Sequence, residues 1–254
     1  MKLIVLGSGT SAPHPRRSSP AFWLQTTSGS ALLDIGPDSA SRMAQESLDW
    51  PGLDAIWLSH FHLDHFGGLA PFLFSLKWAP ETQSRTKPLK IMGPVGLKNL
   101  INVIDESNNY RLFAVPFPLD IVEVKPGEHF EFLPGIQGVT MKTPHNRESL
   151  ALRLSEAQSK SFVYTSDTGF TEDISWFAKD VDLLLMECSF KRNKPLQTHL
   201  EFAESLELAR KSNARQVVLT HLYPEWDGTD LTAEAKLAGS GDTREAVDGL
   251  TITF

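Results

Sequence analysis

The chain has 254 residues, 41% of them hydrophobic, and a single cysteine. This content supports a large core, which we expect to form one domain over residues 1–254, while one cysteine excludes a disulfide framework or a cysteine-based zinc cluster. The net charge of −7 argues against an extended nucleic-acid surface, since such surfaces are usually basic, but it is compatible with a small anionic substrate. The N-terminus lacks the features of a signal peptide, and no run reaches the ~18 apolar residues of a membrane span. We therefore expect a cytoplasmic protein without membrane contact.

Short apolar runs separated by Gly-, Ser- and Pro-rich turns predict a succession of strands and helices. In the first half, strands are expected at Lys2–Gly7, Ala21–Thr26, Ala31–Asp34, Asp54–Ser59 and Leu89–Met92, and helices at Pro37–Glu46, Gly68–Lys77 and Val95–Glu106. In the second half, strands are expected at Ile121–Lys125, Phe130–Phe132, Val139–Thr143, Leu150–Leu154, Ser161–Thr165, Leu183–Glu187 and Val217–Thr220, and helices at Asp173–Lys179 and Leu200–Ser212. The pattern predicts an α+β fold of two mixed sheets packed face to face with helices outside. Periodicity alone does not distinguish it from other layered folds.

Three of the chain's 8 histidines lie in one six-residue segment, His60-Phe61-His62-Leu63-Asp64-His65, directly after an expected strand. Imidazole and carboxylate groups are suitable ligands for Zn²⁺, Mn²⁺ or Fe²⁺. Side chains at i and i+2 of an extended segment share one side. His60 and His62 can therefore hold one ion, while Asp64 and His65, beyond the turn, face a second.

Three more ligand-type residues, His145, Asp167 and His221, each stand just beyond an expected strand. Taken singly, such a residue more often caps a turn or is a hydrogen-bonded core histidine. Together they predict one metal site pooled at one edge of the sheets.

These motifs resemble those of the metallo-β-lactamase superfamily, and within it the ribonuclease Z-like and small-phosphodiesterase branch. The resemblance covers nearly the whole chain through Leu6–Pro13, Arg17, His60–His65 with Gly67-Gly68, His145, Ser166-Asp167-Thr168 and Thr220-His221-Leu222. It implies a four-layer αβ/βα sandwich that binds two Zn²⁺ ions per chain, with Mn²⁺ or Fe²⁺ possible instead. The implied ligands are His60, His62 and His145 for the first ion, Asp64, His65 and His221 for the second, and Asp167 as a bridge.

The resemblance also implies a reaction, the hydrolysis of a phosphodiester. Two ions about 3.5–4 Å apart can hold a bridging hydroxide and clamp the oxygens of the diester. Asp64 could in addition accept the proton of the bridging water, as the matching residue is taken to do in related enzymes.

His199 is the predicted proton donor for the leaving group. Leu185–Phe190 and the following Thr198-His199-Leu200-Glu201 resemble a paired motif of the ribonuclease Z branch, in which a His-Glu-Ala-Thr stretch precedes a histidine at a helix start. Thr198 and Glu201 match a capping box, which would place His199 in the first helical turn, close to an incoming phosphate. The alternative is an exposed histidine without a role.

Glu187 is the candidate for a residue that orients His199 or a metal ligand, although it could simply end a strand. Met186 stands where the family motif has a histidine. The chain therefore departs from the family motif at this position.

The segment between two implied ligands bears on the substrate. Ribonuclease Z enzymes that process tRNA carry a long arm, which in the common bacterial form lies between the ligands matching His145 and Asp167. Here Asn146–Ser166 leaves room for two strands and the turn Glu156–Lys160 only. We therefore expect a small or flexible phosphodiester: a cyclic nucleotide, a cyclic ribose phosphate or an RNA 3′ end. Basic residues at Arg17 and Lys191–Lys194 are candidates for phosphate contacts, although such a scatter is usually a solvated surface.

Three alternatives remain open. The chain could be a tRNA 3′-processing endonuclease without the arm, a lactone or thioester hydrolase of the same fold, or a non-enzymatic metal- or nucleic-acid-binding remnant. Because relatives often dimerise, a homodimer is the expected assembly.

Overall fold

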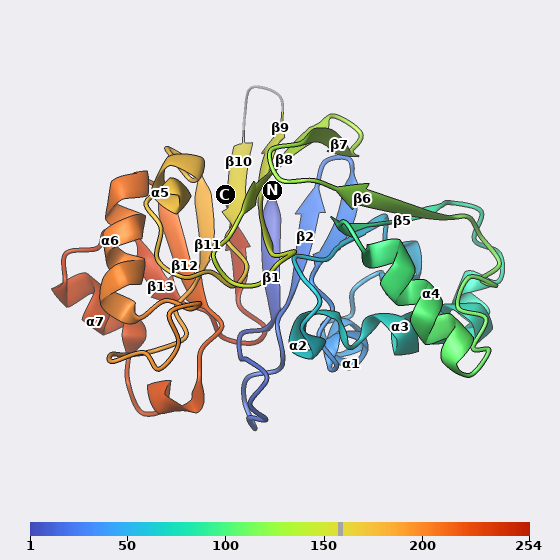
Figure 1. Ribbon diagram of the computed structural model, residues 1–254, viewed down its shortest axis with the longest axis horizontal. Helices are drawn as coiled ribbons and strands as arrows, with labels where there is room; N and C mark the ends of the chain where they lie inside the picture. The colour runs from blue at the N-terminus through green and yellow to red at the C-terminus, as the bar shows by residue number, and fades with distance from the viewer. Residues whose placement is uncertain (157–159) are drawn as a thin grey trace.

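The computed structural model describes residues 1–156 and 160–254, so the central residues of the turn expected at Glu156–Lys160 lie outside the described residues. Within the described residues, the strands form two seven-stranded sheets that pack face to face with helices on their outer sides (Figure 1). The predicted α+β sandwich of two mixed sheets is confirmed.

The first sheet has the strand order β14-β1-β2-β3-β4-β5-β6. These strands are β1 (Lys2–Gly7), β2 (Ala21–Thr26), β3 (Gly29–Leu33), β4 (Ala55–Trp57), β5 (Leu89–Pro94), β6 (Leu119–Val124) and β14 (Thr251–Thr253). The pairs β14–β1, β1–β2 and β2–β3 are antiparallel, whereas the pairs β3–β4, β4–β5 and β5–β6 are parallel. The parallel strands therefore end at a common edge.

The second sheet mirrors this arrangement with the order β13-β12-β11-β10-β9-β8-β7. Its strands are β7 (His129–Leu133), β8 (Ile136–Lys142), β9 (Leu150–Glu156), β10 (Lys160–Tyr164), β11 (Leu183–Glu187), β12 (Gln216–Thr220) and β13 (Thr243–Glu245). Strands β10 to β13 are parallel and β7 to β10 antiparallel.

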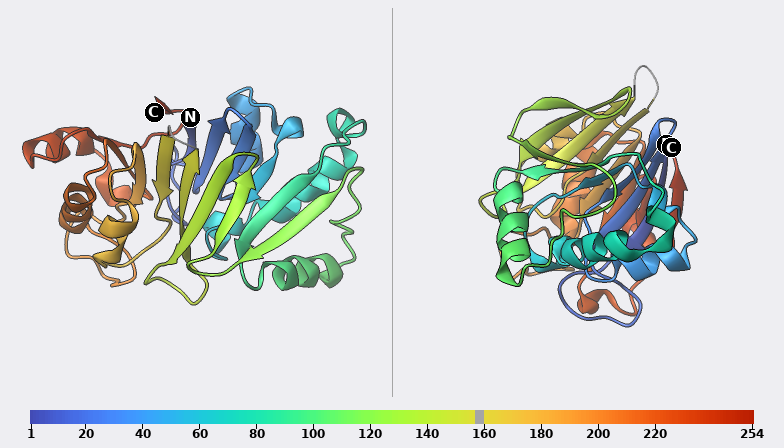
Figure 2. Two further views of the ribbon diagram at one scale, coloured as in Figure 1. Left: turned by 90° about the horizontal axis from the view of Figure 1, so that it is seen from above. Right: turned by 90° about the vertical axis from the view of Figure 1, so that its right-hand side faces the viewer.

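Helices cover the outer face of each sheet (Figure 2). The first sheet carries α1 (Ser39–Gln45), α2 (Leu63–Phe66), α3 (Leu69–Trp78) and α4 (Leu97–Ser107), and the second carries α5 (Asp173–Phe177), α6 (Phe202–Ser212) and α7 (Leu231–Leu237). Single 3-10 turns lie at Trp50–Gly52, Pro80–Thr82 and Pro224–Trp226. Among the residues described, no helix has the length and apolarity to cross a membrane.

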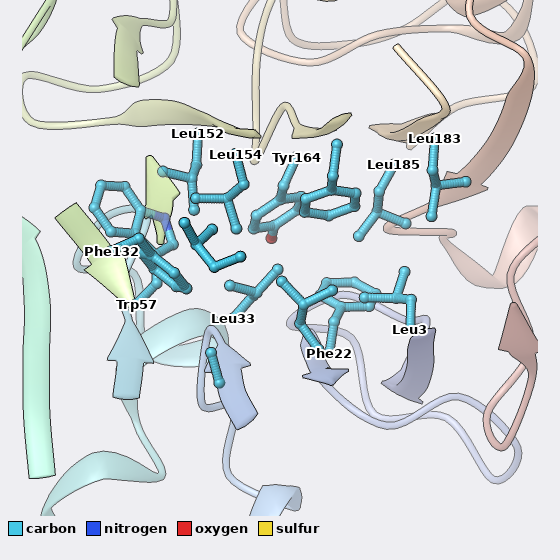
Figure 3. Close-up of a cluster of buried hydrophobic side chains, with 14 of the residues drawn as sticks. Leu3, Phe22, Leu33, Trp57, Phe132, Leu152, Leu154, Tyr164, Leu183 and Leu185 are labelled. Atoms are coloured by element: carbon cyan, nitrogen blue, oxygen red, sulfur yellow. The ribbon is translucent and has the colours of Figure 1, made fainter. Parts of the chain in front are cut away.

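The inner core lies between the two sheets (Figure 3). Phe22 and Leu33 from the first sheet face Tyr164 and Leu185 from the second, and the rings of Phe22 and Tyr164 meet edge to face with centroids 5.3 Å apart. Separate outer cores join each sheet to its helices. Because both faces of each sheet are buried, the central strands are apolar at successive positions, as β1 illustrates.

The elements near the C-terminus were not anticipated. Helix α7 and strands β13 and β14 each have seven residues or fewer, and the two strands are too short to show an alternating pattern. Strand β14 pairs with β1, with Ile252 opposite Leu3, and so forms one edge of the first sheet.

Candidate metal centre

The ligand-type residues stand at strand ends on one edge of the sandwich. His60 and His62 follow β4, and α2 begins directly after His62, so that Asp64 and His65 lie in its single turn. His145, Asp167 and His221 follow β8, β10 and β12 of the second sheet. Both sheets therefore contribute, and the structure brings all seven predicted residues together.

Their ligand atoms form overlapping groups. His60, His62, His145 and Asp167 each offer an atom within 4.8 Å of the others, and Asp64, His65 and His221 form a second such group. Asp167, His199 and His221 form a third group, which shares one residue with each of the other two. Asp167 lies at the centre: one carboxylate oxygen is 3.3 Å from His65 Nε2, and the other is 3.4 Å from His221 Nε2 and 3.6 Å from His145 Nε2. The grouping agrees with the two sets implied by the resemblance, including the central position of Asp167.

Several polar atoms in this cluster are buried without a hydrogen-bond partner among the described residues. They are His60 Nε2, His65 Nε2, His221 Nε2 and Asp167 Oδ1. Buried polar atoms are nearly always paired, so each exception requires an explanation. Imidazole nitrogens and a carboxylate oxygen that face one another are a donor set suited to divalent cations. The residues present therefore fit a metal centre.

Asp34 organises two of the histidines and was missed from the sequence. Its buried carboxylate accepts hydrogen bonds from His65 Nδ1 at 2.7 Å, from Tyr164 Oη at 2.6 Å, and from the backbone N and Oγ of Ser59 at 2.7 and 2.8 Å. Because Ser59 Oγ donates to Asp34, it accepts from His60 Nδ1, 3.0 Å away. This network assigns the Nδ1 protons of His60 and His65 and leaves both Nε2 atoms free to bind metal. The only sequence signal was a carboxylate directly after a buried strand.

Glu187 has the same function in the second sheet. Ser189 Oγ donates to its carboxylate at 2.6 Å and accepts from His221 Nδ1 at 2.9 Å, while His199 Nδ1 lies 3.1 Å from the other carboxylate oxygen. The backbone N atoms of Thr168 and Leu200 also donate to Glu187. One buried carboxylate therefore orients both a predicted ligand and the predicted proton donor.

Met186 packs on the opposite side of β11 from Glu187. Its side chain is fully buried in the outer core with Leu206 and Leu219. The position that holds a histidine in the family motif therefore contributes to packing in this chain, and Met186 has no contact role in the metal centre.

The prediction that His199 lies in the first turn of a helix is wrong. Helix α6 begins at Phe202, and its capping box is formed by Glu201 and Glu204 instead of Thr198 and Glu201. The reason is that Glu201 finds a reciprocal partner three residues ahead, while Glu187 takes the backbone N of Leu200. His199 lies instead in a bend of the irregular segment that precedes α6, and it is 6% exposed.

Burial and charge set the protonation of the site. Burial lowers the pKa of His199, but the hydrogen bond and negative charge of Glu187 outweigh it, so the net pKa is raised. Burial together with neighbouring imidazoles lowers the pKa of His60 and His145 and keeps them neutral. Burial would raise the pKa of Asp167, yet the charges of His221 and His65 hold it well below its usual range. Burial lowers the pKa of His65, but the charges and hydrogen bonds of Asp167 and Asp34 outweigh it and raise that pKa well above its usual range. A metal that binds at His65 must therefore displace a proton, so metal binding releases protons.

Three residues around the site adopt left-handed backbone conformations that non-glycine residues rarely adopt. Asp34, Ser166 and His221 have φ values of 56°, 56° and 59°. Each stands where a strand ends and the chain turns sharply beside the cluster. Such conformations cost of order 1–3 kcal/mol each and concentrate at functional sites.

Arg17 and Lys194, two of the basic residues considered as phosphate contacts, are engaged in other interactions. Arg17 is 9% exposed and makes ion pairs with Asp227 at 2.6 Å and Glu245 at 3.1 Å. Lys194 pairs with Glu204 at 2.8 Å. These contacts fix the loops around the site and leave neither cation free to bind a phosphate.

Comparison with known proteins agrees with this fold. The chain is 25% identical to probable metallo-hydrolase YhfI of Bacillus subtilis, with 98% of each chain covered, and 24% identical to ribonuclease Z of Archaeoglobus fulgidus, with 92% of each covered. The crystal structure of the metallo-β-lactamase fold protein YhfI superposes with a TM-score of 0.83 at 24% identity, covering 99% of this chain and 98% of YhfI. Human tRNase Z, short form, gives 0.80 at 20% identity, covering 100% and 99%.

The fold and the His/Asp cluster define a metallo-hydrolase of the ribonuclease Z-like branch of the metallo-β-lactamase superfamily. The predicted four-layer sandwich is thereby confirmed. The family described as "Anti-Pycsar protein Apyc1" matches residues 1–238, and the chain belongs to this family.

Proposed function

We propose that this protein is a dinuclear zinc-dependent phosphodiesterase that cleaves a small or flexible phosphodiester, with a cyclic nucleotide as the first candidate. The observation that carries the proposal is the pairing of His199 with Glu187, 3.1 Å apart, beside the His/Asp cluster. A proton donor so placed is needed for an alkoxide leaving group, as in phosphodiester cleavage.

His60, His62 and His145 would hold one zinc ion, and Asp64, His65 and His221 the other, with Asp167 between them. When bound, the two ions supply an activated water and neutralise the charge of the phosphoryl oxygens. Asp34 and Glu187 fix the imidazoles so that their Nε2 atoms need little reorientation when metal binds.

Two residues of the chain would each transfer one proton. Asp64 accepts a proton from the water that attacks phosphorus. The P–O bond to the leaving group breaks, and His199 donates the proton from Nε2 to the departing oxygen while Glu187 holds its Nδ1 proton. Water adds to phosphorus as the P–O bond breaks, so a cyclic nucleotide gives one product that carries both the phosphomonoester and the new hydroxyl group.

A small substrate is favoured over a folded RNA by the segment between His145 and Asp167. Strands β9 and β10 occupy most of it, which leaves no room for a long RNA-binding arm. The net charge of −7 also disfavours binding of a folded RNA, because such binding depends on many Lys and Arg contacts with phosphates. The second candidate, an armless tRNA 3′-processing endonuclease, is favoured by the similarity to ribonuclease Z of Archaeoglobus fulgidus.

A panel of esters tests the substrate class. We expect the zinc-loaded protein to hydrolyse bis(p-nitrophenyl) phosphate and at least one purine or pyrimidine 3′,5′-cyclic nucleotide, and to leave lactones, thioesters and precursor tRNA uncleaved. Product formation followed by liquid chromatography is the measurement. If a lactone or thioester is hydrolysed and the phosphodiesters are not, the protein belongs to a different class of hydrolase.

Metal removal tests the centre itself. We expect chelation to lower the melting temperature and zinc to restore it, because a ligand at 100 times its Kd stabilises the folded state by about 2.7 kcal/mol. Differential scanning fluorimetry with and without zinc measures this shift. The shift should become smaller in His65→Ala, which keeps the ligands of the first ion, and should persist in full in His129→Ala, whose side chain is exposed and far along the chain from the cluster; equal shifts in both variants would contradict the assignment.

A further inference from the structure

A cavity of about 400 Å³ lies beside the metal centre, between the ends of β5 and β6 and the chain that joins β8 to β9. Its walls include Phe61, Val95, Val124 and Leu150, and Arg147 and Glu148 also line it. Pockets for small organic ligands begin at about 300 Å³ and are mostly apolar with a few polar groups. The cavity meets both conditions.

The cavity and the metal centre share their dividing wall. Phe61 stands between His60 and His62 in an extended segment, so its ring points to the opposite side from the two imidazoles. On the other side of the cavity, Arg147 follows His145 by two residues. The backbone N of Leu150 donates to Ser59 O at 3.0 Å and ties the two segments together. Residues within two positions of His60, His62 and His145 in the chain therefore line this cavity.

The polar side chains of the cavity differ in whether they already bind another part of the chain. Lys142 Nζ donates to the backbone oxygens of Thr143 and Asn146, and so it braces the loop that carries His145. The side chain of Arg147 is exposed, and Glu148 is half-buried beside it. A guanidinium that donates next to a carboxylate that accepts matches the mixed donors and acceptors on the edge of a nucleobase.

We propose that this cavity binds the nucleobase of the substrate while its phosphodiester lies at the metal centre. The inference rests on the proposed phosphodiesterase function. It assigns recognition of the nucleobase to residues that lie outside the His/Asp cluster. The base stacks on the ring of Phe61, as unpaired bases do on aromatic side chains, and Arg147 and Glu148 hydrogen-bond to its edge. A base with an exocyclic amino group, such as cytosine or guanine, uses both groups.

Filling the cavity tests this assignment. Val95 lines the cavity and is 54% exposed, while Val103, on the same helix–turn region, is 55% exposed and is not a lining residue. We expect Val95→Trp to weaken binding of cytidine 5′-monophosphate to the zinc-loaded protein roughly tenfold, the effect of losing one base stack. Binding of ribose 5-phosphate, which lacks the base, should be unchanged, and Val103→Trp should alter neither ligand. Isothermal titration calorimetry gives the dissociation constants.

The outcomes separate this inference from the proposed function. If Val95→Trp leaves nucleotide binding unchanged, or weakens both ligands equally, the cavity is not the base site, even if diesters are cleaved. If no diester is cleaved but Val95→Trp selectively weakens the nucleotide, the cavity assignment stands and the catalytic proposal fails. For a cleaved cyclic nucleotide, the same variant should raise KM by a similar factor with kcat unchanged.

Discussion

Replacement of His199 by alanine is expected to lower kcat for a cyclic nucleotide by a factor of about 10²–10⁴, the usual contribution of a positioned proton donor. The pKa of His199 is raised because the hydrogen bond and charge of Glu187 outweigh burial, and this shift favours the protonated imidazole that a proton donor requires. Without it, the departing alkoxide must leave unprotonated. His199 is not among the seven predicted ligands, so the zinc content should not change. Steady-state kinetics and metal analysis on the same preparation measure both quantities.

The leaving group provides the control for this prediction. A p-nitrophenolate ion departs more readily than a ribose alkoxide, because it is a much weaker base and needs less protonation. The variant should therefore lose far less activity with bis(p-nitrophenyl) phosphate than with the cyclic nucleotide. Equal losses with both substrates would instead indicate a disturbed metal centre and remove His199 from the role of proton donor.

Replacement of Asp34 by alanine is expected to have the largest effect on stability. The change leaves the side chains of His65, Ser59 and Tyr164 without their buried acceptor. Removing one partner from a buried charged network costs about 3–5 kcal/mol. Because His60 and His65 then lose their fixed orientation, zinc affinity should also fall by about 10–100-fold. Urea unfolding of the metal-free protein and competition with a zinc chelator measure the two effects separately.

Tyr164→Phe is the matched control for Asp34→Ala. It removes one of the hydrogen bonds to Asp34 and preserves the ring that packs against Phe22. The expected loss of stability is about 1 kcal/mol, with zinc affinity close to that of the native protein. If Asp34→Ala proves no worse than Tyr164→Phe, then Asp34 does not organise the metal centre.

The sequence was sufficient to locate the candidate site because its signals are local. His60 to His65 are contiguous, and His145, Asp167 and His221 each follow an apolar run that can be read as a strand. Spacing and strand ends thus place the seven side chains at one edge without knowledge of the packing. Whether they bind zinc stays a prediction.

The features that were missed depend on contacts between distant segments. Asp34 receives bonds from Ser59, His65 and Tyr164, and the last of these lies 130 residues away. No local pattern distinguishes such a carboxylate from one that merely ends a strand. The start of α6 was misplaced for a related reason, because two capping boxes compete, and Glu187 decides between them by binding the backbone N of Leu200.

The left-handed positions limit how this site can change during evolution. At Asp34, Ser166 and His221, the backbone strongly disfavours β-branched residues, whereas glycine and asparagine fit. A descendant that lost the chemistry would be released from keeping the carboxylate and the imidazole, but it would still have to make the same turns. Glycine or asparagine at these positions would therefore mark a lineage that kept the fold after catalysis had decayed, and would distinguish it from one that lost the architecture as well.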